Sequence, residues 1–153
     1  MVNDHDLEKY SRQIILNEIG PEGQEKINRV NILVIGAGGL GSSVIQYLSA
    51  AGVGKIGIAD DDKVELSNLN RQLIYRENDL GKNKVDATKN YISKSNPSTE
   101  IETYKIRIDE KNLPSIIGDY DLIADCSDNI ETRLSINDIC VKYKKTWVMA
   151  AVG

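Results

Sequence analysis

The stretch Val30-Asn-Ile-Leu-Val-Ile-Gly-Ala-Gly-Gly-Leu-Gly41 decides the fold of this 153-residue chain. Its apolar half predicts a buried strand, and its glycines predict a turn that leads into a helix. We expect Gly36 to permit the tight turn, Gly38 to let backbone N–H groups approach a pyrophosphate, and Gly41 to let the helix pack closely on the strand. The helix N-terminus adds partial positive charge at the same place. The stretch therefore predicts a nucleotide-binding site.

Composition excludes several other classes of protein. Apolar residues make up 41% of the chain and charged residues 27%, with a net charge of −4. Lys and Arg form no basic stripe, which disfavours nucleic-acid binding. No apolar run approaches the roughly 20 residues that span a bilayer, and the N-terminus lacks the pattern of a signal peptide. We therefore expect a cytoplasmic protein of ordinary globular composition with no membrane partner.

Cysteine and histidine are scarce. Cys126 and Cys140 are too few and too far apart to form a metal site, and both lie in apolar patterns. We expect both to be buried small hydrophobic side chains, and no zinc site within this chain. His5 is the single histidine, which excludes a histidine-based triad here.

The rest of the chain alternates strand and helix patterns. Apolar spacing predicts a helix over 6–18, and Gly20 and Pro21 separate it from a short helix that runs to residue 28. We expect strands at 31–35, 55–60, 100–105, 121–125 and 147–152, and helices at 40–51, 84–95 and 130–143. This order predicts an α/β, Rossmann-like, mostly parallel sheet with helices on both faces. We divide the chain into an N-terminal helical arm, 1–28, and a Rossmann-like domain, 29–153.

The last predicted strand reads as buried, yet the sequence stops at Gly153, directly after it. A buried parallel strand is normally followed by a helix that covers it. We therefore expect that the chain is truncated after its fifth strand, or that another polypeptide completes the sheet.

An acidic residue, Asp60, closes the second strand 19 residues after Gly41. In the Rossmann pattern, an acid at this place accepts hydrogen bonds from ribose hydroxyls. The alternative is a solvated carboxylate at a strand end. Asp61 and Asp62 read as solvated carboxylates, although Asp62 is close enough to count among the candidate nucleotide ligands.

Two cations follow in the sequence. Arg71 lies in Ser67-Asn-Leu-Asn-Arg-Gln72, and Lys84 lies near a helix N-terminus, where a cation opposes the helix dipole. Together they bring more positive charge to the phosphate site than a dinucleotide pyrophosphate needs, which suits a triphosphate. The alternative is that both are ordinary surface cations.

Asp128 follows the predicted strand 121–125, and ligands of open α/β sheets bind at the carboxyl ends of strands. A carboxylate facing phosphates would be repulsive alone, but it becomes a sensible ligand with Mg²⁺. Alternatively, Asp128 caps the helix that begins near Ile130.

Six motifs together resemble the ThiF/MoeB/HesA adenylyltransferases, which are similar to the adenylation domain of ubiquitin-activating enzymes. The resemblance covers nearly the whole chain and rests on Tyr10-Ser-Arg-Gln13, Gly36-Ala-Gly-Gly-Leu-Gly41, Ala51-Gly-Val-Gly54, Ser67-Asn-Leu-Asn-Arg-Gln72, Gly81-Lys-Asn-Lys-Val85 and Asp125-Cys-Ser-Asp-Asn129. One glycine loop would not be specific, whereas six motifs in register are.

The resemblance implies that Mg-ATP adenylates the C-terminal glycine carboxylate of a ubiquitin-like sulfur carrier of the ThiS/MoaD type, in thiamin or molybdopterin biosynthesis. By position, Gly39 would lie beside the phosphates and Asp60 would hold the ribose. Asn68, Arg71 and Lys84 would contact the phosphate chain, and Asp128 would bind Mg²⁺. The same motifs carry Ser67 and Asn129 into the nucleotide site, and Arg12 would reach the ATP of the partner subunit in a homodimer.

Departures from the family pattern leave two alternatives open. The Cys-x-x-Cys pairs and transfer cysteine of many members do not occur here, and neither do the later strands of the carrier-protein groove. One alternative is a non-catalytic nucleotide-binding or dimerisation module of this family. The other is a nicotinamide-dependent oxidoreductase, which fits the glycine turn and Asp60 but leaves Arg71, Lys84 and Asp128 without a role.

Overall fold

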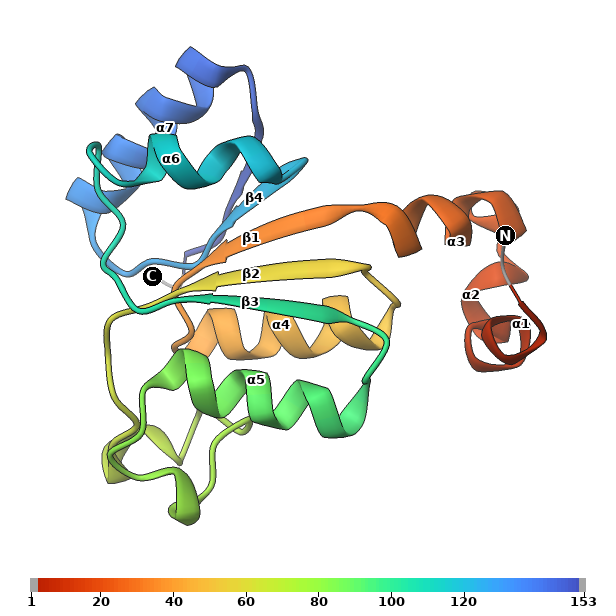
Figure 1. Cartoon of the computed structure of the whole chain (residues 1–153), viewed down its shortest axis with the longest axis horizontal. Coiled ribbons are helices and arrows are strands. Elements are labelled where there is room, and N and C mark those ends of the chain that lie inside the picture. Colours follow the sequence, from red (N-terminus) through yellow and green to blue (C-terminus); the bar gives the residue numbers. More distant parts are fainter. Residues whose placement is uncertain (1–2, 152–153) are drawn as a thin grey trace.

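The computed structural model describes residues 3–151, which form a five-stranded parallel sheet in the order β3-β2-β1-β4-β5 (Figure 1). The strands are β1 (Asn31–Ile35), β2 (Lys55–Ala59), β3 (Glu100–Tyr104), β4 (Leu122–Asp125) and β5 (Thr146–Met149). β1 pairs with β2 on one side and with β4 on the other, so the strand order reverses beside β1. The predicted Rossmann-like sheet is confirmed.

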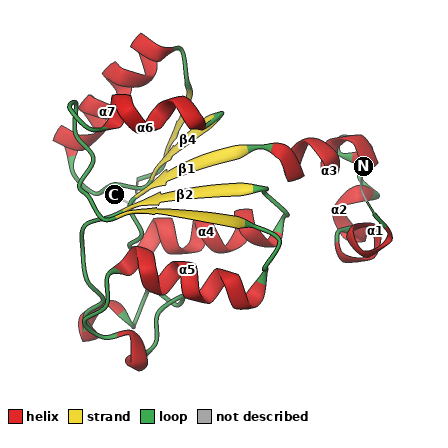
Figure 2. Cartoon of the chain, viewed as in Figure 1, coloured by secondary structure: helices red, strands yellow, loops and turns green. Residues whose placement is uncertain are grey.

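Helices cover both faces of the sheet, as predicted (Figure 2). α4 (Gly39–Ala50) and α5 (Lys84–Ser95) lie on one face, and α6 (Leu113–Ile116) and α7 (Ile130–Tyr143) lie on the other. Ile32 and Val34 of β1 belong to one hydrophobic core, whereas Leu33 and Ile35 belong to the second. Burial on both faces explains why β1 reads as a continuous apolar run. None of the helices within residues 3–151 has the length and apolar character that a membrane crossing requires.

The turn between β1 and α4 depends on two glycines. Gly36 has a φ of +93°, in the left-handed region that side chains with a Cβ rarely adopt. A Cβ on Gly41 would lie 1.8 Å from the carbonyl oxygen of Gly36, so α4 can begin this close to β1 only with glycine at position 41. Gly38 is the N-cap of α4, and the first N–H groups of the helix follow it.

The N-terminal arm departs from the predicted single helix over 6–18. The structure has two short helices there, α1 (Asp4–Lys9) and α2 (Ser11–Ile14), and α3 (Gly20–Arg29) follows. The helix breaks at Tyr10, because the tyrosine side chain is buried against the end of α4, where a Cβ on Gly52 would meet its ring. The Gln13 amide donates to the carbonyl of Ala51 at 2.8 Å, which ties the arm to the same place.

The C-terminal part differs from the prediction in two ways. α6 was not expected, because a single turn of helix carries too few residues to show a period. β5 was expected over 147–152 as a buried strand, but it ends at Met149, and Val148 and Met149 are about half exposed. Within the described residues, β5 has a hydrogen-bonded neighbour on one side only, which leaves it at an edge of the sheet. The expected last residue, Val152, lies outside the described residues.

Replacing Gly41 by alanine should destabilise the protein by about 1–3 kcal/mol, because the new methyl group would push α4 away from the carbonyl of Gly36. Chemical denaturation followed by circular dichroism measures the change. Gly39→Ala is the matched control, since nothing lies within 4 Å of a Cβ at that position. Equal stability of the two variants would contradict this account of the turn.

Candidate functional site

A cleft of about 920 Å³ opens at the carboxyl ends of the strands, where the strand order reverses. Its walls come from the turn after β1, from the connections after β2 and β3, and from the start of α7. Most of the predicted site residues line it: Gly36, Gly38, Gly39, Asp60, Asp62, Asn68, Arg71, Lys84, Asp128 and Asn129. The fold thus brings the glycine turn, both cations and the carboxylates to one cavity.

Asp60 connects the glycine turn to the segment after β2. One carboxylate oxygen accepts the backbone N–H of Ala37 at 2.7 Å, and the other accepts that of Asp62 at 2.8 Å. Burial raises the pKa of the Asp60 carboxyl against the lowering effect of these two hydrogen bonds. Asp60 is therefore an ordered, half-buried carboxylate of the cleft, and not a solvated one at a strand end.

Lys84 is a buried cation on the wall of the cleft. Its side chain is only 6% exposed, and its Nζ donates to the carboxylate of Asp62 at 2.7 Å. Because burial of an ammonium is costly without a partner, this lysine is no ordinary surface cation. Asp62 was expected to be solvated; its side chain is exposed, but it is held by this ion pair.

Arg71 and Asn68 lie beside each other on the loop after β2. Arg71 is exposed into the cleft, and its Nη1 donates to the carbonyl of Ser67 at 2.9 Å. The Oδ1 of Asn68 accepts the backbone N–H of Glu65 at 3.0 Å, which shapes the short turn that carries both residues. Ser67 itself does not line the cleft, and its hydroxyl points to Glu65.

Asn129 takes the capping role that the sequence left open for Asp128. The Oδ1 of Asn129 accepts the backbone N–H of Thr132 at 2.8 Å, so Asn129, and not Asp128, caps α7. Among residues 3–151, no hydrogen bond or ion pair engages the Asp128 carboxylate, which is exposed into the cleft. An open carboxylate of this kind is a donor that suits a hard cation such as Mg²⁺.

The loop that carries Asp128 is held from both sides. The Oδ1 of Asp125 accepts from the N–H of Ser127 at 2.9 Å and from its hydroxyl at 2.7 Å. Arg133 donates through Nη2 to the carbonyl of Ser127 at 2.5 Å and to that of Ala150 at 3.1 Å. The guanidinium therefore connects the Asp128 loop to the segment after β5.

Sequence reasoning missed several residues of the site. Tyr75 donates its hydroxyl to the carbonyl of Ala37 at 2.7 Å, and supports the glycine turn from behind. Gln72 and Arg107 line the cleft, as does Arg133. Gln72 was visible as part of a motif, whereas an arginine after a strand and a tyrosine in a loop carry no sequence signal of this role.

Besides Ser67, two predicted site residues lie away from the cleft. Gly41 is buried behind the turn and acts through packing. Arg12 is exposed on α2, at the opposite end of the sheet from the carboxyl ends of the strands (Figure 1). Arg12 therefore does not line the cleft of its own chain.

Cys126 lines the cleft, and both cysteines are buried, as predicted. Burial raises the pKa of the Cys126 thiol to about 11, and the nearby Asp125 carboxylate adds to the effect. The pKa of Cys140 is raised to about 11 for the same reasons. Since the thiolate is the nucleophile, neither cysteine is poised for covalent chemistry at neutral pH.

The chain matches a known protein family over most of its length. The model of the ThiF family matches residues 10–153. The sulfur carrier protein adenylyltransferase of Thermus thermophilus is 44% identical over 147 residues, which cover 96% of this chain and 54% of that protein. The adenylyltransferase and sulfurtransferase MOCS3 of Culex quinquefasciatus is 46% identical over 147 residues, covering 96% and 34%. The chain therefore belongs to the ThiF family, and it spans about half of the bacterial relative and a third of the mosquito one.

Solved structures share the same fold. The E. coli tRNA N6-threonylcarbamoyladenosine dehydratase TcdA, solved in complex with ATP, superposes with a TM-score of 0.90 at 22% identity. The match covers 97% of this chain and 61% of TcdA. At this identity the likeness extends to the architecture of the sheet and its helices.

Proposed function

We propose that this chain uses Mg-ATP to adenylate the C-terminal glycine carboxylate of a ubiquitin-like sulfur-carrier protein, as in thiamin or molybdopterin biosynthesis. The observation that carries the proposal is the meeting of Arg71 and the buried Lys84 with the glycine turn in one cleft. Two cations and the N-terminus of α4 suit the charge of a triphosphate. The name of the Thermus relative supports the choice of a sulfur carrier.

The reaction needs positioning and charge more than a nucleophilic side chain. A carboxylate oxygen of the carrier attacks the α-phosphorus, the bond from that phosphorus to the bridging oxygen breaks, and pyrophosphate leaves. Arg71 and Lys84 would stabilise the negative charge on the phosphate chain. Asp60 would accept hydrogen bonds from the ribose, because it directly follows β2 and lies beside the glycine turn. No histidine of the described residues lines the cleft, and this chemistry does not need one, since the attacking carboxylate already bears its negative charge.

Magnesium fits the donor set of the cleft. Asp128 offers an open carboxylate on one wall, and Mg²⁺ commonly takes one or two carboxylates together with phosphate oxygens. Bound there, Mg²⁺ would neutralise charge on the phosphate oxygens. Asp60, Asp61 and Asp62 also place one oxygen each within 4.8 Å of one another, but Asp60 and Asp62 are engaged by backbone N–H groups and by Lys84. We therefore assign the magnesium role to Asp128.

Removing the charge of Arg71 or of Asp128 should strongly slow formation of the adenylate. We expect Arg71→Ala and Asp128→Ala each to lower ATP–pyrophosphate exchange by about 10²- to 10³-fold, as loss of one preorganised charge does at such sites. The measurement is incorporation of labelled pyrophosphate into ATP, with a carrier protein that ends in glycine. Arg76→Ala and Asp138→Ala, exposed charges outside the cleft, should leave exchange unchanged. Normal exchange in both cleft variants would refute the site.

We further propose that Arg12 completes the site of a second copy in a homodimer. Because Arg12 lies at the far end of its own sheet, it can serve only the cleft of a partner. Arg12→Ala and Asp128→Ala should each be inactive, while a mixture of the two proteins should recover up to about a quarter of wild-type exchange, since half of the dimers are mixed and each holds one intact site. A mixture as inactive as its parts would contradict the shared site.

A further inference from the structure

The ion pair of Lys84 with Asp62 joins two segments that are far apart in the sequence. In addition to the 2.7 Å contact of the side chains, the backbone N–H of Lys84 donates to the carbonyl of Asp62 at 3.0 Å. Lys63 and Asn83 form an antiparallel bridge at the same place. Asp62 and Lys84 therefore hold each other by main chain and by side chain. A shift of the Asp62 segment therefore moves Lys84 with it.

Asp62 is also fixed relative to the phosphate site. Its backbone N–H donates to one oxygen of Asp60, and the other oxygen of Asp60 accepts the N–H of Ala37 in the glycine turn. An unbroken series of short contacts thus runs from the turn through Asp60 and Asp62 to the ammonium of Lys84. The series sets where that ammonium lies in the cleft.

An ammonium needs such an anchor to act at a defined point. Lysine carries a flexible four-carbon stem and three N–H donors. One donor satisfied by Asp62 leaves two for phosphate oxygens, while the burial of the stem limits its other rotamers. Asp62 itself is 65% exposed, so its carboxylate contributes little to the core and can be changed without opening a cavity.

We infer that Asp62 is a positioning residue: its carboxylate holds the Lys84 ammonium where the phosphate chain of ATP must bind. This inference rests on the proposed function. A carboxylate beside phosphates repels them, so Asp62 opposes binding of ATP and its benefit lies in the reactive arrangement that it enforces. Loss of the carboxylate should therefore lower kcat and leave the KM for Mg-ATP unchanged or reduced.

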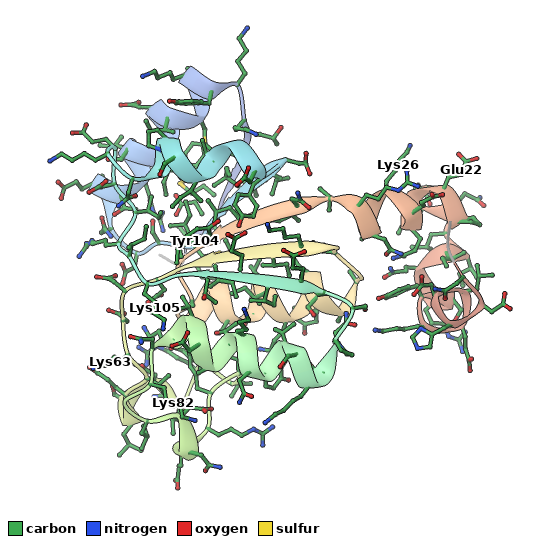
Figure 3. The ribbon with its side chains drawn as sticks, viewed as in Figure 1. Glu22, Lys26, Lys63, Lys82, Tyr104 and Lys105 are labelled. Atoms are coloured by element: carbon green, nitrogen blue, oxygen red, sulfur yellow. The ribbon has the colours of Figure 1, made fainter. Side chains whose placement is uncertain are left out.

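Asp62→Asn tests the inference, because it removes the charge and keeps the size of the side chain. We expect kcat for ATP–pyrophosphate exchange to fall by about 10- to 100-fold, with the KM for Mg-ATP no higher than in the wild type. The matched control is Asp86→Asn, since Asp86 pairs with Lys105 at 2.7 Å on the same end of α5 but outside the cleft. Figure 3 shows Lys105 there, above Lys63 and Lys82. This control should leave kcat and KM unchanged.

A second measurement follows Lys84 in the protein without nucleotide. An amine-reactive ester followed by peptide mass spectrometry should label Lys84 slowly in the wild type and faster in Asp62→Asn, with no change in Asp86→Asn. In a Lys84→Met background, Asp62→Asn should cause no further loss of kcat, because the carboxylate acts through the lysine.

The outcomes separate the two proposals. Wild-type protein that neither binds Mg-ATP nor exchanges pyrophosphate overturns the proposed function and this inference together. If Asp62→Asn exchanges pyrophosphate at the wild-type rate, or if its KM rises by the same factor as its kcat falls, the positioning role of Asp62 is overturned and the proposed function stands. The same holds if Asp62→Asn lowers kcat further in the Lys84→Met background, or if Lys84 is labelled as fast as Lys105 in the wild type.

Discussion

The close approach of α4 to the end of β1 is the constraint on which the rest of the site depends. With glycine at position 41, the helix can begin against the carbonyl of Gly36, and its first N–H groups face the space beyond the strand ends. The order β3-β2-β1-β4-β5 then places the ends of β2 and β4 on either side of that space. The carboxylates that follow these strands, Asp60 and Asp128, reach the cleft from opposite walls.

Electrostatics gives the cleft its chemical character. A helix N-terminus, Arg71 and Lys84 favour an anion of high charge, whereas Asp62 anchors one of these cations. A dinucleotide-binding site would leave much of this positive charge unused. Hydrogen bonds also fix the segments that carry these groups. Tyr75 bonds to the glycine turn, and Asp125 and Arg133 bond to the loop of Asp128. These contacts limit the movement of the charged groups, which is what catalysis by preorganised charge requires.

How far the sequence predicts this structure depends on whether the signal is local. The helices 84–95 and 130–143 match α5 and α7 to the residue, because turn residues mark both of their ends. The break at Tyr10 could not be predicted, since it arises from burial of that side chain against a segment more than 40 positions away. The exposure of β5 could not be predicted either: Val148 and Met149 are about half exposed and β5 is an edge strand among the described residues, whereas its mostly apolar sequence indicated burial. For the site, most of the residues that motif spacing predicted line the cleft, whereas the contacts of Asp62, Tyr75 and Arg133 arise only in three dimensions.

The central claim is that the cleft binds ATP. Calorimetric titration of the protein with Mg-ATP and, separately, with NAD tests it most directly. We predict saturable binding of Mg-ATP that is weaker in Lys84→Ala, and no comparable binding of NAD, because Arg71 and Lys84 suit the charge of a triphosphate. If the folded protein binds NAD tightly and does not bind Mg-ATP, the claim is contradicted. The glycine turn would then indicate a nicotinamide-dependent oxidoreductase.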